Sequence, residues 1–517
     1  MAVLAMIALC EQTAFNSISP YLPDMVLSFP EVDYRGVGVY VGTLASAFAL
    51  AQFVTNYFWG WLSDRVGRKP VILLGTILTA VCFVAFGLCR TLWQAIVVQA
   101  LMGAVNGNQG LVSTCLGEVT DRSNQSKAFT YLPVIYGIGG VTGPLMGGLL
   151  IFERNPLNKS EPNPFPYLMP NLLSAIVLIV DFVLSCIFLE ESLEDAEAFP
   201  KFRRKVRALF TWIWQITSFA KRARHVEPPL YHSVRHDDQE HDSELDSASE
   251  APDDEGDQHE LSHSEVWNRD IILLLVSYLI FALCNISFNS LFPVFSQAQP
   301  PLGRALSPSE IGLSQGFTGL VTMIFQIFVF GKLRDKMGNR WSYRAGLFGF
   351  VLSFLLLPFV GYKGDDSKGH LSQKSILMAI ELCFVLLIKT VAAVGGLTSS
   401  LLLVCHHRSQ SSPYKYANKQ VTNSAPNHAV LGALNGLAQT LSAAGRAVGP
   451  FISGGLFSLG ARMKPQGVYM TFGVFAAVSF VGFVLSFGIR GRSLEAEGDQ
   501  NEDENYKSDD EEGSPGR

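Results

Sequence analysis

Twelve apolar runs of roughly 20 residues constrain this chain more than any other feature, because each is long enough to cross the ~30 Å hydrocarbon core of a bilayer as a helix. Six runs lie in the first part of the chain, at about 3–27, 37–59, 70–89, 93–116, 130–152 and 168–189. Six lie in the second part, at about 270–293, 311–330, 343–361, 375–403, 429–458 and 467–489. The pattern predicts an all-α membrane protein with twelve transmembrane helices in two pseudo-symmetric six-helix halves. The first run lacks a basic leader and a small-residue cleavage site, so we interpret it as a retained first span.

Two short charged segments, Gly60–Lys69 and Gly331–Arg340, occupy the same place in each half and share the spacing G-x-L-x-D-[RK]-x-G-x-[RK]. This repetition indicates an internal duplication. Glycine tolerates positive φ and close helix approach, so we expect tight turns at Gly67 and Gly338 and converging helices at Gly60 and Gly331. The aspartate is expected to pair with a basic neighbour or with helix-start N–H groups. The candidate gating residues are Gly60, Asp64, Arg65, Gly67, Arg68, Lys69, Gly331, Asp335 and Gly338.

Charge in the short loops predicts that both segments, both chain ends and the central segment lie in the cytoplasm, since basic residues concentrate there. We expect an N-terminal half at 1–189, a largely disordered cytoplasmic linker at 190–268, a C-terminal half at 269–490 and an acidic disordered tail at 491–517. Residues 405–421 interrupt the second half, and we interpret them as a loop insertion. The sequon at Asn158 is expected on the outer side.

Glycine stripes mark two further spans. Gly139, Gly143 and Gly147 recur every four residues beside Pro144 and Gly148, which favours close contact with another helix. Span eleven carries a counterpart with Gly445, Gly449 and Pro450.

The chain resembles the major facilitator superfamily, and within it the twelve-span drug:proton antiporter branch. Gly60–Lys69 matches the superfamily signature between spans two and three, and Gly139–Gly148 matches the G-x-x-x-G-P-x-x-G-G signature associated with antiporters. Further strings are similar to fungal members related to plant zinc-induced facilitator-like carriers: Cys10-Glu11, Pro20–Pro23, Asn106–Asn108, Pro170–Leu172 and Asn423–Pro426. The resemblance implies a secondary transporter. At the position where antiporters usually have an arginine thought to assist proton transfer, this chain has Gln99, whereas Glu11 matches a family acidic residue in span one.

Ionisable side chains inside a span are costly and by default face a cavity or a partner. The proton-coupling candidates are Glu11, Asp181 and Glu381, of which Glu11 is the first choice. The alternative for Glu11 is a fixed hydrogen bond or a place near the membrane face. For the other two it is structural pairing or outward placement.

Polar side chains within spans are candidates for the substrate cavity, although each could instead make an interhelical hydrogen bond. They are Asn16, Gln52, Asn56, Gln99, Asn106, Asn108, Asn285, Asn289 and Arg446. Arg446 could instead fix span eleven, and Lys389 could snorkel. Aromatic residues such as Phe15, Tyr21, Phe53, Tyr136, Phe288 and Phe292 would suit an apolar, partly cationic solute.

The sequence therefore predicts a multi-pass protein of the plasma or vacuolar membrane that exports or sequesters small organic solutes by proton antiport. No P-loop and no nucleophile with its base occur, so we expect neither ATP use nor enzyme activity. We expect no cofactor, no metal site, no nucleic-acid partner and a monomer in the bilayer. The alternatives are a uniporter or metal-chelate carrier of the same fold, and a nutrient receptor that binds without transporting.

Overall fold

The computed structural model describes residues 2–119, 122–152, 154, 161–191, 269–364, 372–406, 428–463 and 467–489. Within these ranges only the backbone is described at 117, 119, 122–133, 270–271, 334–335, 401–406 and 428–439. The linker beyond residue 191, residues 407–421, the tail and Asn158 lie outside the described residues, so the predictions made for them stay predictions.

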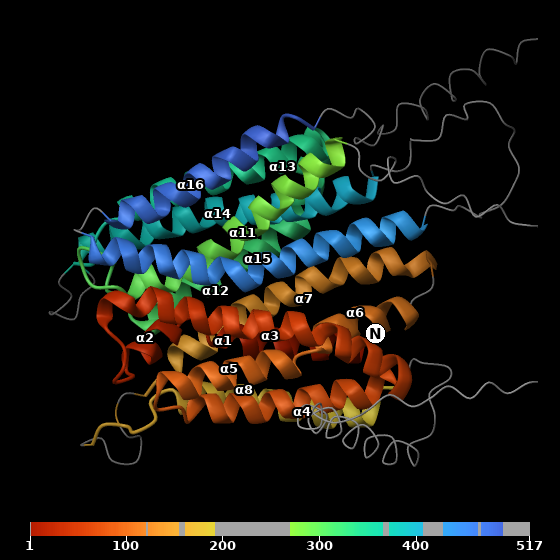
Figure 1. The fold of residues 1–517 in the computed structure, drawn as a ribbon, viewed down its shortest axis with the longest axis horizontal. Coiled ribbons are helices and arrows are strands. Elements are labelled where there is room, and N and C mark those ends of the chain that lie inside the picture. Colours follow the sequence, from red (N-terminus) through yellow and green to blue (C-terminus); the bar gives the residue numbers. More distant parts are fainter. Residues whose placement is uncertain are drawn as a thin grey trace, which may run out of the picture. The chain divides into compact units, whose positions relative to one another are not determined.

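Helices form at the positions of all twelve apolar runs, which confirms the predicted fold class (Figure 1). The first half contains α1 (Ala2–Ser17), α2 (Leu22–Leu27), α3 (Val37–Val66), α4 (Arg68–Gly87), α5 (Leu92–Val105), α6 (Asn108–Val119), α7 (Arg122–Leu149) and α8 (Leu168–Phe188). The second half contains α11 (Arg269–Gln297), α12 (Pro308–Ile324) with the π-helical η2 (Phe325–Phe330), α13 (Gly331–Leu356), α14 (Gln373–His406), α15 (His428–Arg462) and α16 (Gly467–Ser486).

Two of the predicted spans are broken. The first run divides around Pro20 into α1 and α2, and the fourth divides at Asn106 and Gly107 into α5 and α6.

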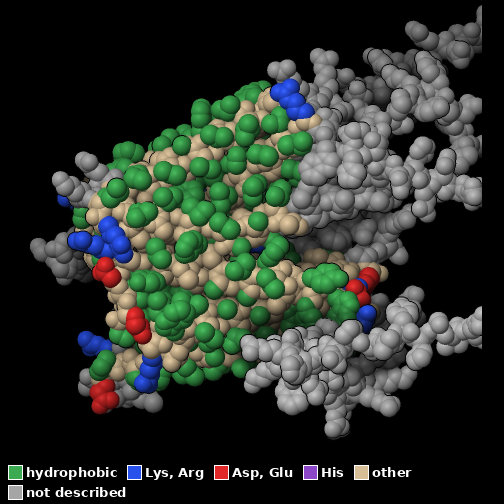
Figure 2. All heavy atoms as spheres, viewed as in Figure 1, with side chains coloured by type: hydrophobic (Ala, Val, Ile, Leu, Met, Phe, Trp, Pro, Cys, Tyr) green, Lys and Arg blue, Asp and Glu red, His purple; other side chains and the backbone are tan. Residues whose placement is uncertain are grey.

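In the part of the chain that the structure describes, eight helices are by length and composition apolar enough to cross a membrane. Figure 2 shows hydrophobic side chains over the flanks of the helices and charged side chains near the helix ends. This distribution fits a bilayer around the bundle.

The two halves share the predicted turn. Gly67 separates α3 from α4 with φ 111° and ψ 155°, and Gly338 interrupts α13 with φ 76° and ψ 161°. Residues with a Cβ rarely adopt such angles, which confirms the expectation for both glycines. The convergence expected at Gly60 and Gly331 is wrong in this conformation, because a Cβ at either position would meet nothing within 4 Å.

Glycine contacts join the two halves along two helix pairs, α3 with α15 and α7 with α12. A Cβ on Gly454 of α15 would lie 1.9 Å from the backbone oxygen of Gly38 in α3. A Cβ on Gly148 of α7 would lie 3.1 Å from Cα of Gly312 in α12. The missing side chains thus bring backbones of opposite halves into direct contact.

The glycine stripe of α7 has two faces. Gly139, Gly143 and Gly147 pack on α1, where a Cβ on Gly147 would lie 1.8 Å from the backbone oxygen of Ser17. Gly148 and the backbone oxygen of Pro144 contact α12 in the other half. In span eleven, Gly449 packs on α11 and the backbone oxygen of Pro450 contacts Gly42 of α3. Each glycine stripe therefore packs against helices of its own half and of the opposite half, and the two stripes do so in the same way.

We define the hairpin end as the end of the bundle that carries Gly60–Lys69 and Gly331–Arg340. Hydrogen bonds join the halves toward the opposite end: Gln297 Nε2 donates to Asp24 Oδ1 at 2.6 Å, and the backbone N–H of Val39 donates to Ser458 Oγ at 2.9 Å. Toward the hairpin end, Tyr57 on α3 is 82% exposed. The halves are therefore tightly joined at the end away from the hairpins.

Candidate functional site

A cavity of about 260 Å³ lies between the two halves and is lined by both of them. Helices α1, α3 and α5 contribute Phe15, Phe48 and Gln99, whereas α11 and α15 contribute Asn289 and Pro450. The wall is mostly apolar, with a few polar groups from Ser19, Gln99, Asn289 and Ser290. Such a lining suits a small organic solute, for which apolar surface gives affinity and a few polar groups give orientation.

The predicted carboxylate Glu11 is buried one helical turn from Phe15, on the same face of α1. Its Oε1 accepts a hydrogen bond from Asn108 Nδ2 at 2.6 Å, and the same amide lies 3.0 Å from Thr76 Oγ1. Asn108 is the first residue of α6, which begins at the break in span four. Glu11 therefore sits at the N-terminus of a half-helix, where backbone N–H groups favour negative charge while burial opposes it. A carboxyl group balanced in this way can bind and release a proton.

Of the other two acidic candidates, one is placed like Glu11 and one is not. Asp181 of α8 is 0% exposed, lies within electrostatic range of Glu11, and has no hydrogen-bond partner on either carboxylate oxygen among the described residues. Glu381 of α14 is half-buried, and its Oε2 accepts the backbone N–H of Gly361 at 2.7 Å. Glu381 thus holds the loop after α13, which fits the structural alternative.

The break between α5 and α6 explains two of the polar candidates. Gln52 Nε2 donates to the backbone oxygen of Asn106 at 3.4 Å, and Trp59 Nε1 donates to that of Ala104 at 2.7 Å. Both bonds satisfy carbonyl groups that the interrupted helix leaves free. Gln52 and Asn106 do not line the central cavity, so their expected role there is wrong in this conformation.

The remaining cavity candidates divide between the wall and the packing behind it. Gln99 and Asn289 line the cavity, and their role toward a substrate stays a prediction. Asn16 packs against Gly143, and Asn285 buries its Oδ1 without a partner among the described residues. Arg446 is half-buried within electrostatic range of Tyr278. Of the aromatic residues, Phe15 reaches the cavity, whereas Phe288 and Phe292 are buried in the second half.

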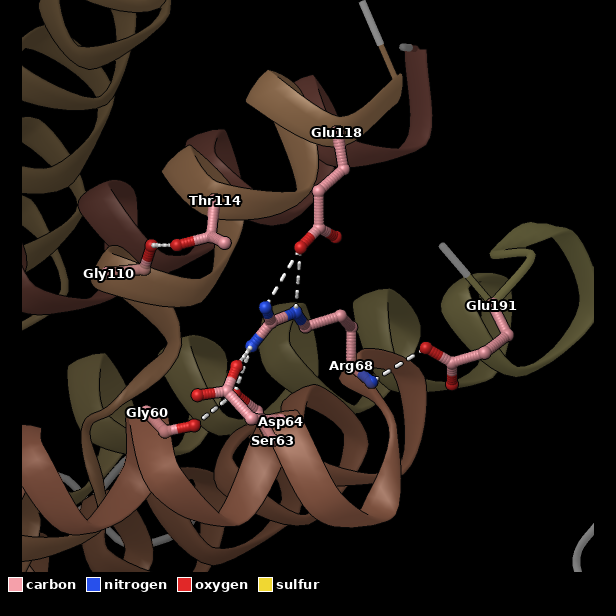
Figure 3. A network of polar contacts seen from close by, with 8 residues as sticks. All are labelled: Gly60, Ser63, Asp64, Arg68, Gly110, Thr114, Glu118 and Glu191. Atoms are coloured by element: carbon pink, nitrogen blue, oxygen red, sulfur yellow. Dashed lines mark hydrogen bonds and ion pairs between the residues drawn. The ribbon is translucent and has the colours of Figure 1, made fainter. Parts of the chain in front are cut away.

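The first charged hairpin is held by a network centred on Arg68 (Figure 3). Arg68 Nη1 lies 2.6 Å from Asp64 Oδ1, and Arg68 Nη2 lies 2.8 Å from Glu118 Oε1 at the end of α6. Glu191, just after α8, accepts the backbone N–H groups of Arg68 and Lys69 at 2.7 and 3.1 Å. The hairpin thus ties together spans two, three, four and six.

The other basic residues of this hairpin have local contacts. Lys69 Nζ donates to the backbone oxygen of Cys186 at 3.0 Å, and the guanidinium of Arg65 stacks over Trp61 at 4.3 Å from the ring centroid. Asp64 pairs with a basic neighbour, Arg68, as predicted. The helix-start N–H groups, which were the alternative partners expected for Asp64, donate to Glu191 instead. In the second hairpin the residue equivalent to Arg68 is Asn339, and the side chain of Asp335 lies outside the described residues.

The model of the Major Facilitator Superfamily matches residues 4–412. The chain belongs to this superfamily. A major facilitator superfamily multidrug transporter, mfsB of Aspergillus fumigatus, is 29% identical over 89% of this chain and 78% of its own length. The Arabidopsis thaliana protein zinc induced facilitator 1 is 26% identical over 93% of this chain and 89% of its own length. These relatives confirm the resemblance to drug transporters and zinc-induced facilitator-like carriers, and the protein is a multi-pass membrane transporter.

The fold agrees with solved structures of other facilitators. The nucleoside transporter NupG superposes with a TM-score of 0.57 at 11% identity, covering 94% of this chain and 98% of its own. At this identity the likeness shows the fold alone.

Sequence reasoning missed Glu118 and Glu191 in this facilitator. A signal was available, because each carboxylate stands at the end of an apolar run on the side where the basic hairpin emerges. Acidic residues at span ends facing a basic loop are natural partners for it.

We expect Arg68→Met to lower the free energy of unfolding by about 1–3 kcal/mol, since charged hydrogen bonds to Glu118 and Asp64 are lost. Asp64 is 62% exposed, so most of the effect should come from Glu118. The measurement is thermal unfolding of the purified facilitator in detergent. Arg65→Met is the matched control, because a stacked surface cation contributes only about 0.5–1 kcal/mol. Equal destabilisation by the two variants would contradict the network.

Proposed function

We propose that the protein exports or sequesters small organic solutes across its membrane by proton antiport, through alternating access. The observation that carries the proposal is a cavity at the junction of the halves, with a buried, hydrogen-bonded carboxylate one turn from its wall. Two pseudo-symmetric halves that rock about such a cavity can expose it to each side in turn. Because the charge bias assigns the hairpin end to the cytoplasm, the conformation described here corresponds to an inward-facing state.

The proposed exchange uses Glu11 as the proton carrier. When the cavity faces the proton-rich side, Glu11 takes up a proton and the solute leaves. When the cavity faces the cytoplasm, the proton is released and solute binds. Asp181 stands close enough to act as a second proton site behind Glu11. The related multidrug transporter of Aspergillus fumigatus supports small organic solutes as the transported class. We further propose that the transporter works as a monomer in the plasma or vacuolar membrane.

A proteoliposome assay with an imposed pH gradient tests this proposal. Solute accumulation that follows the gradient and collapses with a proton ionophore is the expected result. Equal flux with and without the gradient would contradict antiport and identify a uniporter. Saturable binding without any flux would identify a receptor instead.

Uniport is a second candidate for one reason. The cavity wall carries the neutral Gln99 at the position where related antiporters usually have an arginine. Gln99→Arg offers a direct comparison in the same vesicles. If wild-type flux ignores the gradient and Gln99→Arg restores a response, the uniport reading is correct.

A further inference from the structure

Lys389 lies in the middle of the second half, on α14. It lies at the midpoint of α14 (Gln373–His406), the depth at which a span crosses the membrane centre. Its Nζ donates to Asn289 Oδ1 at 2.7 Å and lies 5.6 Å from the ring centroid of Phe288. Asn289 itself lines the central cavity. Among the described side chains, no carboxylate lies within ion-pair distance of Lys389. A cation at this depth is costly unless something compensates it.

Arg446 is a second cation on the same side of the cavity. It lies one turn before Pro450 on α15, on the same helical face, and Pro450 lines the cavity. A Cβ on the neighbouring Gly445 would lie 3.5 Å from the backbone nitrogen of Leu283 in α11, so the two residues are at the same height in the bundle. Leu283 precedes Asn289 by six residues on α11. At 1.5 Å per residue this places Arg446 ~9 Å nearer the hairpin end than Asn289. Among the described residues Arg446 also has no carboxylate within ion-pair distance.

Glu11, the buried carboxylate one turn from the cavity wall, and Asp181, within electrostatic range of Glu11, belong to the first half. Lys389 and Arg446, which have no ion-pair partner among the described residues, belong to the second half. The first half also supplies the aromatic rings of Phe15 and Phe48 to the cavity wall. One wall is thus suited to an apolar body and the other to a negative group.

We propose that the substrate of this transporter is a small organic anion with an apolar or aromatic body. Its anionic group pairs with Lys389, beside the amide of Asn289, and its body packs against Phe15 and Phe48. Arg446 attracts the anion as it enters from the hairpin end. The proposal rests on the proposed transport function and narrows the substrate class. It also explains why two cations stand in the second half with no ion-pair partner among the described residues, because the bound anion supplies the compensating negative charge.

The rival explanation is that Lys389 only fixes Asn289. A neutral glutamine could donate that hydrogen bond equally well, so Lys389→Gln separates the two readings. Lys389→Arg keeps the charge. Lys374→Met, on the same helix but exposed at its start, is a control for loss of a lysine outside the cavity.

The test is equilibrium binding to the purified full-length protein in detergent, with three probes that share one ring system: naphthoate, naphthamide and naphthylmethylammonium. Wild type should bind naphthoate more tightly than naphthamide by about tenfold or more, as for a charged hydrogen bond in a partly desolvated site. Lys389→Gln should lose that preference. Lys389→Arg should retain most of it, and Lys374→Met should retain all of it. Melting curves of each variant verify that it is folded.

Several results would overturn the proposal: naphthoate that fails to bind saturably, naphthylmethylammonium that binds as tightly as naphthoate, or a Lys389→Gln protein that keeps the preference. These outcomes are independent of the transport proposal. Selective naphthoate binding without flux in vesicles would leave the anion site standing and remove the transporter mechanism. Gradient-driven flux of another solute, in a protein that shows no preference for anions in binding, would remove the anion site and leave the transport proposal standing.

Discussion

Glu11→Gln is expected to abolish gradient-driven accumulation while leaving solute binding and solute exchange at equal pH intact. Glutamine has the shape of glutamate and can still bond with Asn108, but it cannot take up or release a proton. Accumulation in proteoliposomes should fall at least about tenfold, the change that ~1.4 kcal/mol of lost coupling produces. The measurement compares uptake of one labelled solute with and without an imposed pH gradient.

Glu381→Gln is the matched control for this experiment, because Glu381 accepts a backbone N–H from a loop and lies away from the central cavity wall. It should retain gradient-driven accumulation. Because Asp181 is the proposed second proton site, gradient-driven accumulation in Asp181→Asn is expected to lie between that of Glu11→Gln and that of Glu381→Gln. Unchanged accumulation in Glu11→Gln would reject Glu11 as the carrier.

The second large effect is expected from Gly454→Ala. In the conformation described here a single added methyl on Gly454 would lie 1.9 Å from the backbone oxygen of Gly38 in the opposite half. Overpacking of this kind costs about 1–3 kcal/mol. A cost that falls on only one of two conformations shifts their ratio by roughly 5- to 150-fold. Because the cost applies only while the halves are closed at this end, transport should slow by a similar factor.

The neighbouring Gly455 offers a strict control, since a Cβ there would meet nothing within 4 Å. Alanine favours helices over glycine by ~1 kcal/mol at either position, so a helix defect cannot explain a loss seen at only one of them. We expect Gly455→Ala to transport like wild type. Equal transport rates of the two variants would show that the contact between Gly38 and Gly454 does not control the cycle.

Much of the fold could be predicted from local sequence. Apolar run length predicts the twelve spans, and the charged repeat predicts the positive-φ turns at Gly67 and Gly338, because both depend on residues close together in the chain. The glycine stripe around Gly143 predicts a close contact but not its partner. Which helix approaches depends on tertiary packing, and the structure assigns α1 to one face and α12 to the other.

The site could be predicted less well. Glu11 and Gln99 were found because a charged or amide side chain is unusual within an apolar run. The bond from Asn108 to Glu11 joins residues 97 positions apart, and no pattern within either span reveals it. The break at Asn106 was also missed, so Gln52 was expected at the cavity although it stabilises the broken helix. Polar residues within spans serve packing and function alike, and only their neighbours separate the two.

Distances between spin labels at the two ends of the bundle test the central claim of alternating access most directly. In a protein whose native cysteines are replaced, one label pair joins Asp33→Cys with Met463→Cys, away from the hairpins. The other joins Thr114→Cys with Lys336→Cys, toward the hairpin end. When pH or solute is changed under transport conditions, the first distance should lengthen as the second shortens. Distances that stay fixed, or that change together in the same direction, would contradict the account.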